Sequence, residues 1–296
     1  MTTVRRSRLP PALLPMLGVA LLGLALYWPL MLWANSGSAA RALASGAELG
    51  CSSALACATE LRDPVLPAPG QLLRAFGTLS TPPMAQTSAP YNLLVTAGET
   101  LLGLLLATVT GLLLAALMVL SGAFERVVLP WLIASQTVPV IALAPMLAVL
   151  LGQYGVQGWL PKVLIAAYIA FFPIAVGVAR GLRSADPLHL ELMRTYHAAP
   201  AQVFFRVRMP AALPYLFTGL KVAATAALIG TLVAESSTIS FVGLGKMLAE
   251  NSRASDTLAL WVIMLYCAAL GIGLVGLMGL LERWVTPWRS APSNRA

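Results

Sequence analysis

Residues 186–235 read DPLHLELMRTYHAAPAQVFFRVRMPAALPYLFTGLKVAATAALIGTLVAE, and this stretch decides the fold. Its first half is a polar segment that carries arginines and helix signals of its own. Its second half is an apolar run long enough to be a membrane-spanning helix. We interpret the polar half as a structure that is bound from the aqueous side of a membrane.

The composition of the whole chain fits this interpretation. The chain has 296 residues, of which 58% are hydrophobic and only 10% are charged, and its mean hydropathy is +0.82. A soluble domain carries about 25% charged residues, so this chain lacks the polar surface of a soluble protein. Backbone groups cannot stay unpaired in lipid, so apolar runs of ~18 residues or more predict helices. We expect an all-α, polytopic membrane protein with six transmembrane helices at 12–34, 91–119, 129–151, 162–180, 211–234 and 257–281.

The distribution of Lys and Arg predicts the orientation. With six spans, twelve basic residues fall on the side of the termini and six on the other side, and Lys221 lies inside a span. The positive-inside rule then places both termini and residues 181–210 in the cytoplasm. Anionic lipid headgroups suffice to explain the net charge of +8. The chain has no basic patch with interleaved aromatics, so we expect no nucleic-acid partner.

The predicted organisation has four parts. The basic start and first apolar run resemble a signal peptide, but the run is longer than a signal core, which favours an uncleaved first span. The parts are residues 1–34 (cytoplasmic tail and first span), 35–90 (extracytoplasmic loop with a short interfacial helix at 66–79), 91–285 (core membrane domain, which contains the polar cytoplasmic segment at 186–209) and 286–296 (cytoplasmic tail).

The chain has three cysteines. Cys51 and Cys57 fall in the extracytoplasmic loop, where the compartment permits a disulfide. The alternative is two small apolar residues in a loosely ordered loop. Cys267 falls inside the last span and is interpreted as a packing residue.

The polar segment begins with a strong helix start. Asp186 provides a capping carboxylate, and Pro187 occupies the first helical position. Leu188, Leu192 and Tyr196 then fall along one stripe of the predicted helix. His197 interrupts the pattern, and a second short helix is predicted from Pro200 through Met209. The alternative reading is an amphipathic helix pair that rests on the membrane surface.

The segment resembles the cytoplasmic signature of ABC-importer permeases, E-A-A-x-x-x-G followed by an apolar stretch and L-P. The matching residues are Glu191 to His197 and then Met209-Pro210 and Leu213-Pro214. Further stretches resemble the nitrate, sulfonate and taurine branch of these permeases, and within it those for thiamine precursors such as hydroxymethylpyrimidine. These stretches are ASQTVP at 134–139, ALAP at 142–145, FFP at 171–173 and GLKVAA at 219–224. The resemblance covers about residues 66–289.

The resemblance implies a type I ABC-importer permease fold and a mechanism. Such permeases pair as dimers, here expected to be a homodimer, dock onto a separate ATPase subunit and receive solute from an extracytoplasmic binding protein. It implies that this chain is a transport subunit, not an enzyme, that it binds no cofactor, and that ATP and Mg are held by the ATPase. No G-x-x-x-x-G-K-[ST] occurs in the chain, in agreement with this expectation. The residues implied for ATPase coupling are Glu191, Leu192, Met193, Arg194, Tyr196, His197, Ala198 and Ala199.

Two positions depart from the family pattern. His197 stands where the family has glycine, and Ala199 stands where it often has serine. Histidine is enriched in the left-handed conformation, so the bend survives at a modest cost. Loss of a serine cap costs about 1 kcal/mol. These changes predict weaker or partner-specific docking.

Four polar residues inside spans are candidates for the translocation path. Glu99 and Lys221 reach a similar depth from opposite faces, and buried charges face a partner or a wet cavity. We expect them to pair or to line the path, and the alternative is a snorkelling Lys221 with Glu99 near the headgroups. Gln136 and Thr137 stand beside prolines, which predicts a bent helix that faces the bundle interior. They contact solute or satisfy carbonyls that the prolines free.

Other function classes have little support. No metal-binding spacing and no nucleophile motif is present, so we expect no metal site and no enzyme. An ion-coupled secondary carrier or a channel is the alternative to the permease, but such a carrier would show broken-helix pairs in repeated halves. The solute is a small organic or anionic molecule, either a thiamine-precursor-like pyrimidine or a member of the nitrate, sulfonate and taurine class.

Overall fold

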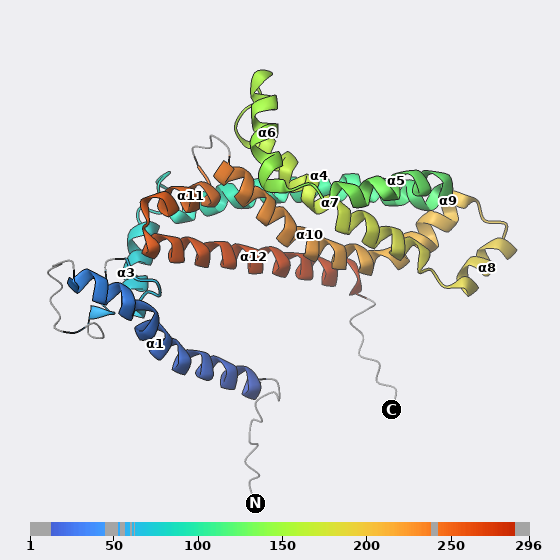
Figure 1. Ribbon diagram of the computed structural model, residues 1–296. Coiled ribbons are helices and arrows are strands. Elements are labelled where there is room, and N and C mark those ends of the chain that lie inside the picture. Colours follow the sequence, from blue (N-terminus) through green and yellow to red (C-terminus); the bar gives the residue numbers. More distant parts are fainter. Residues whose placement is uncertain are drawn as a thin grey trace, which may run out of the picture. The chain divides into compact units, whose positions relative to one another are not determined.

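The computed structural model of the protein describes residues 13–44, 53, 57–59, 61, 63–237 and 242–287. Helices account for nearly all of these residues (Figure 1). They are α1 (Leu13–Ala44), α3 (Pro69–Ser80), α4 (Ala89–Leu120), α5 (Gly122–Ser135), α6 (Val140–Gln153), α7 (Trp159–Arg183), α8 (Pro187–Thr195), α9 (Pro200–Val203), the π-helical turn η1 (Phe204–Arg208), α10 (Met209–Ser237), α11 (Leu244–Ala254) and α12 (Thr257–Val285).

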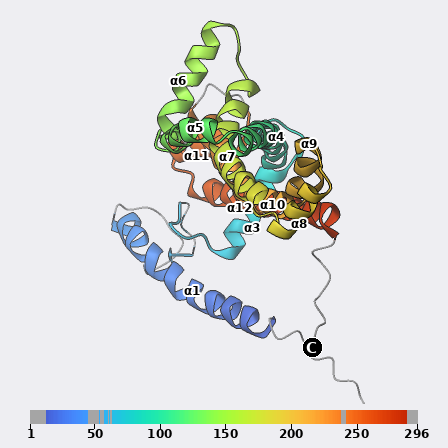
Figure 2. The same ribbon diagram turned by 90° about the vertical axis from the view of Figure 1, so that its right-hand side faces the viewer.

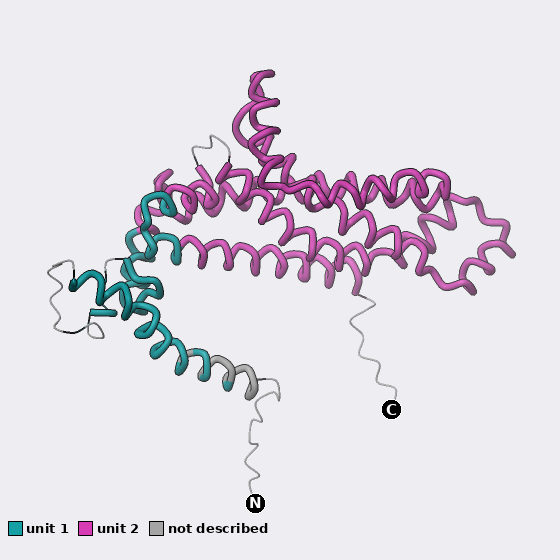
Figure 3. Tube along the Cα trace, viewed as in Figure 1, with its two compact units in different colours: residues 1–78, 251–262 teal, residues 79–250, 263–296 magenta. Residues whose placement is uncertain are grey.

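The chain divides into two compact units (Figure 3). The first contains residues 1–78 and 251–262, and the second contains residues 79–250 and 263–296. The expected all-helical membrane fold is confirmed.

In the first unit, a buried asparagine of α1 holds the segment that leads into α3. The Nδ2 atom of Asn35 donates to the carbonyl oxygens of Ala58 at 3.0 Å and Leu66 at 2.8 Å. Its Oδ1 atom accepts from the backbone N–H of Leu66 at 3.1 Å. The hydroxyl of Tyr27 donates to the carbonyl of Pro67 at 2.6 Å. Because buried polar groups need partners, these bonds fix the path of this segment along α1.

Cys57 is buried in the first unit and is disulfide-bonded. The predicted partner, Cys51, lies outside the described residues, so this pairing stays a prediction. Cys267, in α12, is a free thiol. The expected short helix at 66–79 corresponds to α3 at Pro69–Ser80.

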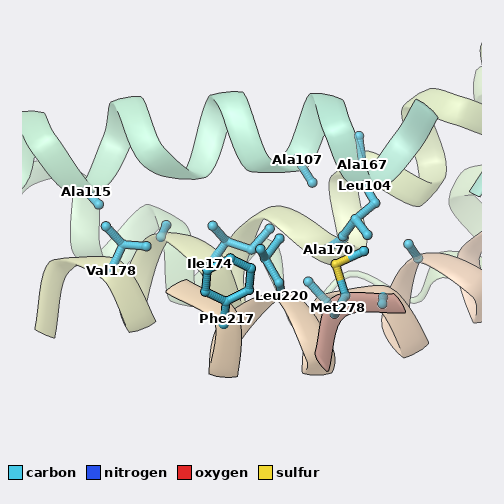
Figure 4. Packing of buried hydrophobic residues seen from close by; sticks show 14 of the residues in the cluster. Leu104, Ala107, Ala115, Ala167, Ala170, Ile174, Val178, Phe217, Leu220 and Met278 are labelled. Atoms are coloured by element: carbon cyan, nitrogen blue, oxygen red, sulfur yellow. The ribbon is translucent and has the colours of Figure 1, made fainter. Parts of the chain in front are cut away.

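In the second unit, α4, α7 and α10 pack closely through small residues. A Cβ atom at Gly103 of α4 would lie 2.5 Å from the Cβ atom of Ala166 on α7. A Cβ atom at Gly181 of α7 would lie 2.8 Å from the Cβ atom of Tyr215 on α10. Figure 4 shows the side chains of α4, α7, α10 and α12 that meet between these helices. Small residues let membrane helices approach closely, and this contact positions the three helices as one bundle.

Four helices of the described residues are long and apolar enough to cross a membrane, or five if a bent helix pair counts as one span. The four are α4, α7, the continuous helix Pro200–Ser237 and α12. They match the spans predicted at 91–119, 162–180, 211–234 and 257–281. The predicted first span, 12–34, falls on α1 and partly outside the described side chains, so the count is compatible with six.

The predicted third span, 129–151, is not one helix. The structure divides it into α5 and α6, whose axes differ by 98°. α5 ends at Ser135, and Pro139, which lacks an N–H and disfavours helical geometry in the residue before it, directly precedes the start of α6 at Val140. The expected bend is therefore a full break, and α6 leaves the α4–α7 bundle in both views (Figures 1 and 2).

Candidate functional site

The predicted helix after Asp186 is present as α8. The carboxylate of Asp186 accepts from the backbone N–H of Leu188 at 2.9 Å and caps the helix. Leu188, Leu192 and Tyr196 are 69%, 51% and 74% exposed. The apolar stripe that the sequence predicted therefore lies on the surface of the second unit.

The bend after α8 occurs at His197, whose φ is +49°. This is the left-handed conformation that glycine adopts freely and that histidine tolerates. The backbone N–H groups of His197 and Ala198 donate to the carbonyls of Arg194 and Met193, which closes the end of the helix. The predicted bend is confirmed.

Ala199 precedes the next helix and has no side-chain cap. The amide oxygen of Gln202 accepts from the backbone N–H of Ala199 at 3.0 Å. This is one half of a capping box, so part of the cap that a serine would provide is replaced by a bond from three residues ahead.

The predicted second short helix does not end at Met209. α9, η1 and α10 form one continuous helix from Pro200 to Ser237. Pro210 is tolerated because it lies at the second residue of α10, where the preceding π turn already alters the local bonding pattern, and Pro214 lies inside α10. As a result, the coupling segment is directly joined to a spanning helix.

A groove of about 440 Å³ separates α8 from the start of α10. Its lining residues come from α8, η1 and α10, and they are His189, Leu192, Met193, Arg206, Val207, Pro210 and Ala211. Met193, one of the predicted coupling residues, is half-buried there.

A buried polar cluster lies at the other end of α10 and is formed by side chains of α4, α7 and α10. Figure 1 shows α8 and the start of α11 at opposite ends of α10. Its members are Asn92, Thr96, Glu99, Thr100, Lys162, Thr231 and Glu235. The Nζ atom of Lys162 forms an ion pair with Oε1 of Glu99, and both side chains are buried. Polar groups this far from water are costly in a membrane protein, so they mark a structural or functional requirement.

The cluster binds the backbone of the turn that opens α11. The N–H of Gly243 donates to Oδ1 of Asn92 at 2.5 Å, and the N–H of Leu244 donates to Oγ1 of Thr96 at 2.9 Å. The N–H of Gly245 donates to Oε2 of Glu235 at 2.7 Å. Glu235 therefore holds the turn that opens α11.

The predicted pairing of Glu99 with Lys221 is wrong. Lys221 forms an ion pair with Glu282 of α12, with 2.5 Å between Nζ and Oε2. Glu99 instead meets Lys162, the residue at which the predicted span 162–180 begins. Depth counted along single helices could not show which helix faces which.

Gln136 and Thr137 do not face the interior of the described bundle. Both side chains are exposed, at the break between α5 and α6. Thr137 donates to the carbonyl of Ala134 at 2.8 Å, so it satisfies one carbonyl that the break frees.

Sequence reasoning missed Lys162, Thr96 and Glu282. One signal was available for Thr96: Asn92, Thr96 and Thr100 recur every four residues within an apolar run, which places them on one helix face. No comparable signal paired Lys162 with Glu99, because the partners come from different helices.

Residues 107–287, more than half of the chain, match the family described as binding-protein-dependent transport system inner membrane component. The chain belongs to this family. Its members are permease subunits of ABC importers, transport subunits that work with an ATPase and a substrate-binding protein. This permease is therefore an inner-membrane transport subunit, and the carrier or channel alternative is set aside.

Individual relatives agree with the family. The permease is 36% identical over 188 residues to the formylaminopyrimidine transport permease protein ThiX of Halalkalibacterium halodurans, which covers 64% of this chain and 73% of the relative. It is 28% identical over 228 residues to the taurine transport system permease protein TauC of Escherichia coli, covering 75% of this chain and 80% of the relative.

A solved structure shares the fold. The MetNI methionine ABC transporter in an inward-facing conformation contains a chain that superposes with a TM-score of 0.61, at 17% identity, covering 70% of this permease and 99% of that chain. At this identity the likeness concerns the fold alone.

Proposed function

We propose that this permease imports a small pyrimidine-type solute and that α8 and the His197 bend dock into a separate ATPase subunit, which binds ATP and Mg. The exposed stripe of Leu188, Leu192 and Tyr196 carries the proposal. Apolar side chains on a capped helix that begins next to a membrane bundle indicate a protein partner, since a contiguous exposed apolar patch marks an interaction site.

The polar neighbours of the stripe give the docking its orientation. Glu191 and Arg194 are exposed beside the stripe on α8, and His197 and Ala198 form the bend that follows. Charged rim residues set register and partner choice, while the apolar centre supplies affinity. In this proposal Ala199 and Gln202 only fix the exit of the chain into α9.

Co-purification with the ATPase encoded beside this chain tests the docking. The variant L192S/Y196S removes two of the three exposed apolar side chains, and we expect it to lose the ATPase while it keeps its own thermal stability. Leu73→Ser is the matched control, because Leu73 is an equally exposed leucine on α3. Retention of the ATPase by L192S/Y196S would contradict the proposal.

The proposed solute class follows the relative ThiX, whose name gives formylaminopyrimidine as its solute. The permease would receive the solute from an extracytoplasmic binding protein. Proteoliposomes that contain the permease, its ATPase and its binding protein would take up radiolabelled formylaminopyrimidine or hydroxymethylpyrimidine in an ATP-dependent manner. Uptake of taurine in place of both pyrimidines would assign the solute to the sulfonate and taurine class instead.

The break between α5 and α6 supports a role for Gln136 and Thr137 in the translocation path of a homodimer. α5 starts directly after α4, and its 14 residues advance ~21 Å, which places its end inside a ~30 Å hydrocarbon layer. The ion pair of Glu125 with Arg183 fixes the start of α5, and the hydroxyl of Tyr168, bonded to the carbonyl of Ser135, fixes its end. Non-helical backbone at this depth must face protein or water, so a second copy and an aqueous path between the copies account for it.

Cysteine labelling tests the path and the orientation. A membrane-impermeant thiol reagent is expected to label Thr137→Cys in the assembled transporter and to leave Leu105→Cys, on the exposed apolar face of α4, unlabelled. With both termini in the cytoplasm, the same reagent added outside intact cells leaves Thr195→Cys unlabelled. Glu99 is ion-paired and buried, and Lys221 is ion-paired and half-buried, so neither is retained as a path residue.

A further inference from the structure

The π-helical turn η1 lies between the coupling segment and the spanning part of the helix. The backbone N–H of Met209 donates to the carbonyl of Phe204, five residues earlier, instead of four as in an α-helix. Such a turn accommodates one residue more than an α-helical turn. π turns are rare, occur mostly as single turns inside α-helices and are frequent at functional sites.

The position of the turn is specific. η1 contributes Arg206 and Val207 to the groove whose opposite wall is formed by His189, Leu192 and Met193 of α8. Downstream, the helix continues without a break to Glu235, which holds the turn at the start of α11. Within the helix from Pro200 to Ser237, η1 is the turn that departs from α-helical bonding, so a change in the register of α9 relative to α10 takes place there.

Two identical side chains stand side by side in η1. Phe204 is half-buried and packs against the hydrophobic core of the second unit. Phe205 is 66% exposed, and its ring meets that of Phe204 edge to face with 5.2 Å between the centroids. One phenylalanine therefore occupies a core position while its neighbour along the chain is available at the surface.

If the additional residue moves from η1 into the turn before Pro200, the residues from Pro200 to Phe205 shift by one position relative to α10. A shift of one residue rotates them by about 100° and advances them by about 1.5 Å. Phe205 then occupies the core position of Phe204, and Phe204 moves to the surface. Because the same side chain is buried in both registers, the burial free energy of this position is nearly equal in both.

We propose that η1 is a register switch, in which Phe204 and Phe205 alternate in one core position as α9 rotates relative to α10. This inference rests on the proposed docking of α8, and it adds the element that converts movement of the docked segment into movement of the spanning helix. A helix with two discrete registers supplies the bistable element that such coupling requires.

Deletion of Phe205 tests the switch. The deletion removes the additional residue, so the helix becomes α-helical throughout, Phe204 keeps its core position and α8 keeps its orientation. We expect the variant to retain the ATPase on co-purification but to lose ATP-dependent pyrimidine uptake by roughly tenfold or more, the scale of typical coupling energies. Uptake at the wild-type rate would overturn the switch.

A second variant decides the question if the deletion does not fold. Phe205→Ser leaves the length of the helix and the core position of Phe204 unchanged, but it places a serine in the core in the alternate register. We expect retained ATPase association with reduced uptake, whereas Trp131→Ser, which removes an equally exposed aromatic residue from α5, leaves uptake unchanged. If Phe205→Ser no longer co-purifies with the ATPase, Phe205 is a docking contact. This result would overturn the proposed switch and support the proposed docking of α8. Unchanged uptake would overturn the switch alone.

Discussion

The hydroxyl of Thr96 on α4 lies 2.8 Å from Oε1 of Glu235 on α10 and donates to it. The hydroxyl oxygen of Thr96 also accepts a hydrogen bond from the backbone N–H of Leu244, at 2.9 Å. One hydroxyl group therefore joins two spanning helices and the first turn of α11. These groups are buried away from water, so the bonds between them satisfy donors and acceptors that water does not reach.

Replacement of Thr96 by valine keeps the shape of the side chain and removes both bonds. Glu235 loses one donor and the N–H of Leu244 loses its acceptor, so we expect a loss of about 1–3 kcal/mol in the free energy of unfolding, measured by denaturant titration in detergent. Thr108→Val on the same helix is the control, because that hydroxyl bonds only to the carbonyl of Leu104 one turn earlier. Equal losses in the two variants would contradict the bridging role of Thr96.

Substitution of Gly243 by alanine is expected to displace the turn from the buried polar cluster. The φ of Gly243 is +128°, and a Cβ atom there would collide with the carboxylate of Glu235. We expect a lowered thermal midpoint and faster proteolysis near the turn. Gly98→Ala, at an exposed helical position with nothing within 4 Å of the added atom, is expected to be neutral or slightly stabilising.

Lys162 and Glu99 are expected to be strongly coupled in stability. Lys162→Met leaves a buried carboxylate without its cation, and breaking a buried pair in this way costs about 3–5 kcal/mol. The double variant E99L/K162M replaces both charges by apolar groups and is expected to recover most of that loss. A double-mutant cycle on the thermal midpoint measures the coupling, and additive losses would show that the ion pair contributes nothing specific.

Asp186→Ala removes the cap of α8. We expect it to destabilise that helix by about 1 kcal/mol. ATPase association should weaken as well, because α8, which carries the exposed apolar stripe, is then helical for a smaller fraction of the time. Asp256→Ala removes an equivalent cap, the bond from Ala259 N at 3.0 Å that opens α12, and serves as the control. ATPase association measured by co-purification should fall for the first variant only.

His197→Gly is expected to leave the fold and the ATPase association intact, because glycine adopts the observed φ of +49° without a steric cost. His197→Val places a β-branched side chain in the left-handed region and should disrupt the bend. If both variants kept full association with the ATPase, the conformation of this residue would have no part in docking.

The sequence by itself determined the membrane class, four of the spans, the helix at Asp186 and the bend at His197. These features depend on local physics: the length of apolar runs, a capping carboxylate followed by proline, and one residue in a left-handed conformation. Only the tertiary structure decided that Lys162, not Lys221, pairs with Glu99, that Glu235 holds the turn at Gly243 to Gly245, and that the helix from Pro200 contains a π turn. Ion pairs and turn contacts join residues from separate helices. Which residues become partners depends on which sides of two helices pack together, and no single helix encodes this packing.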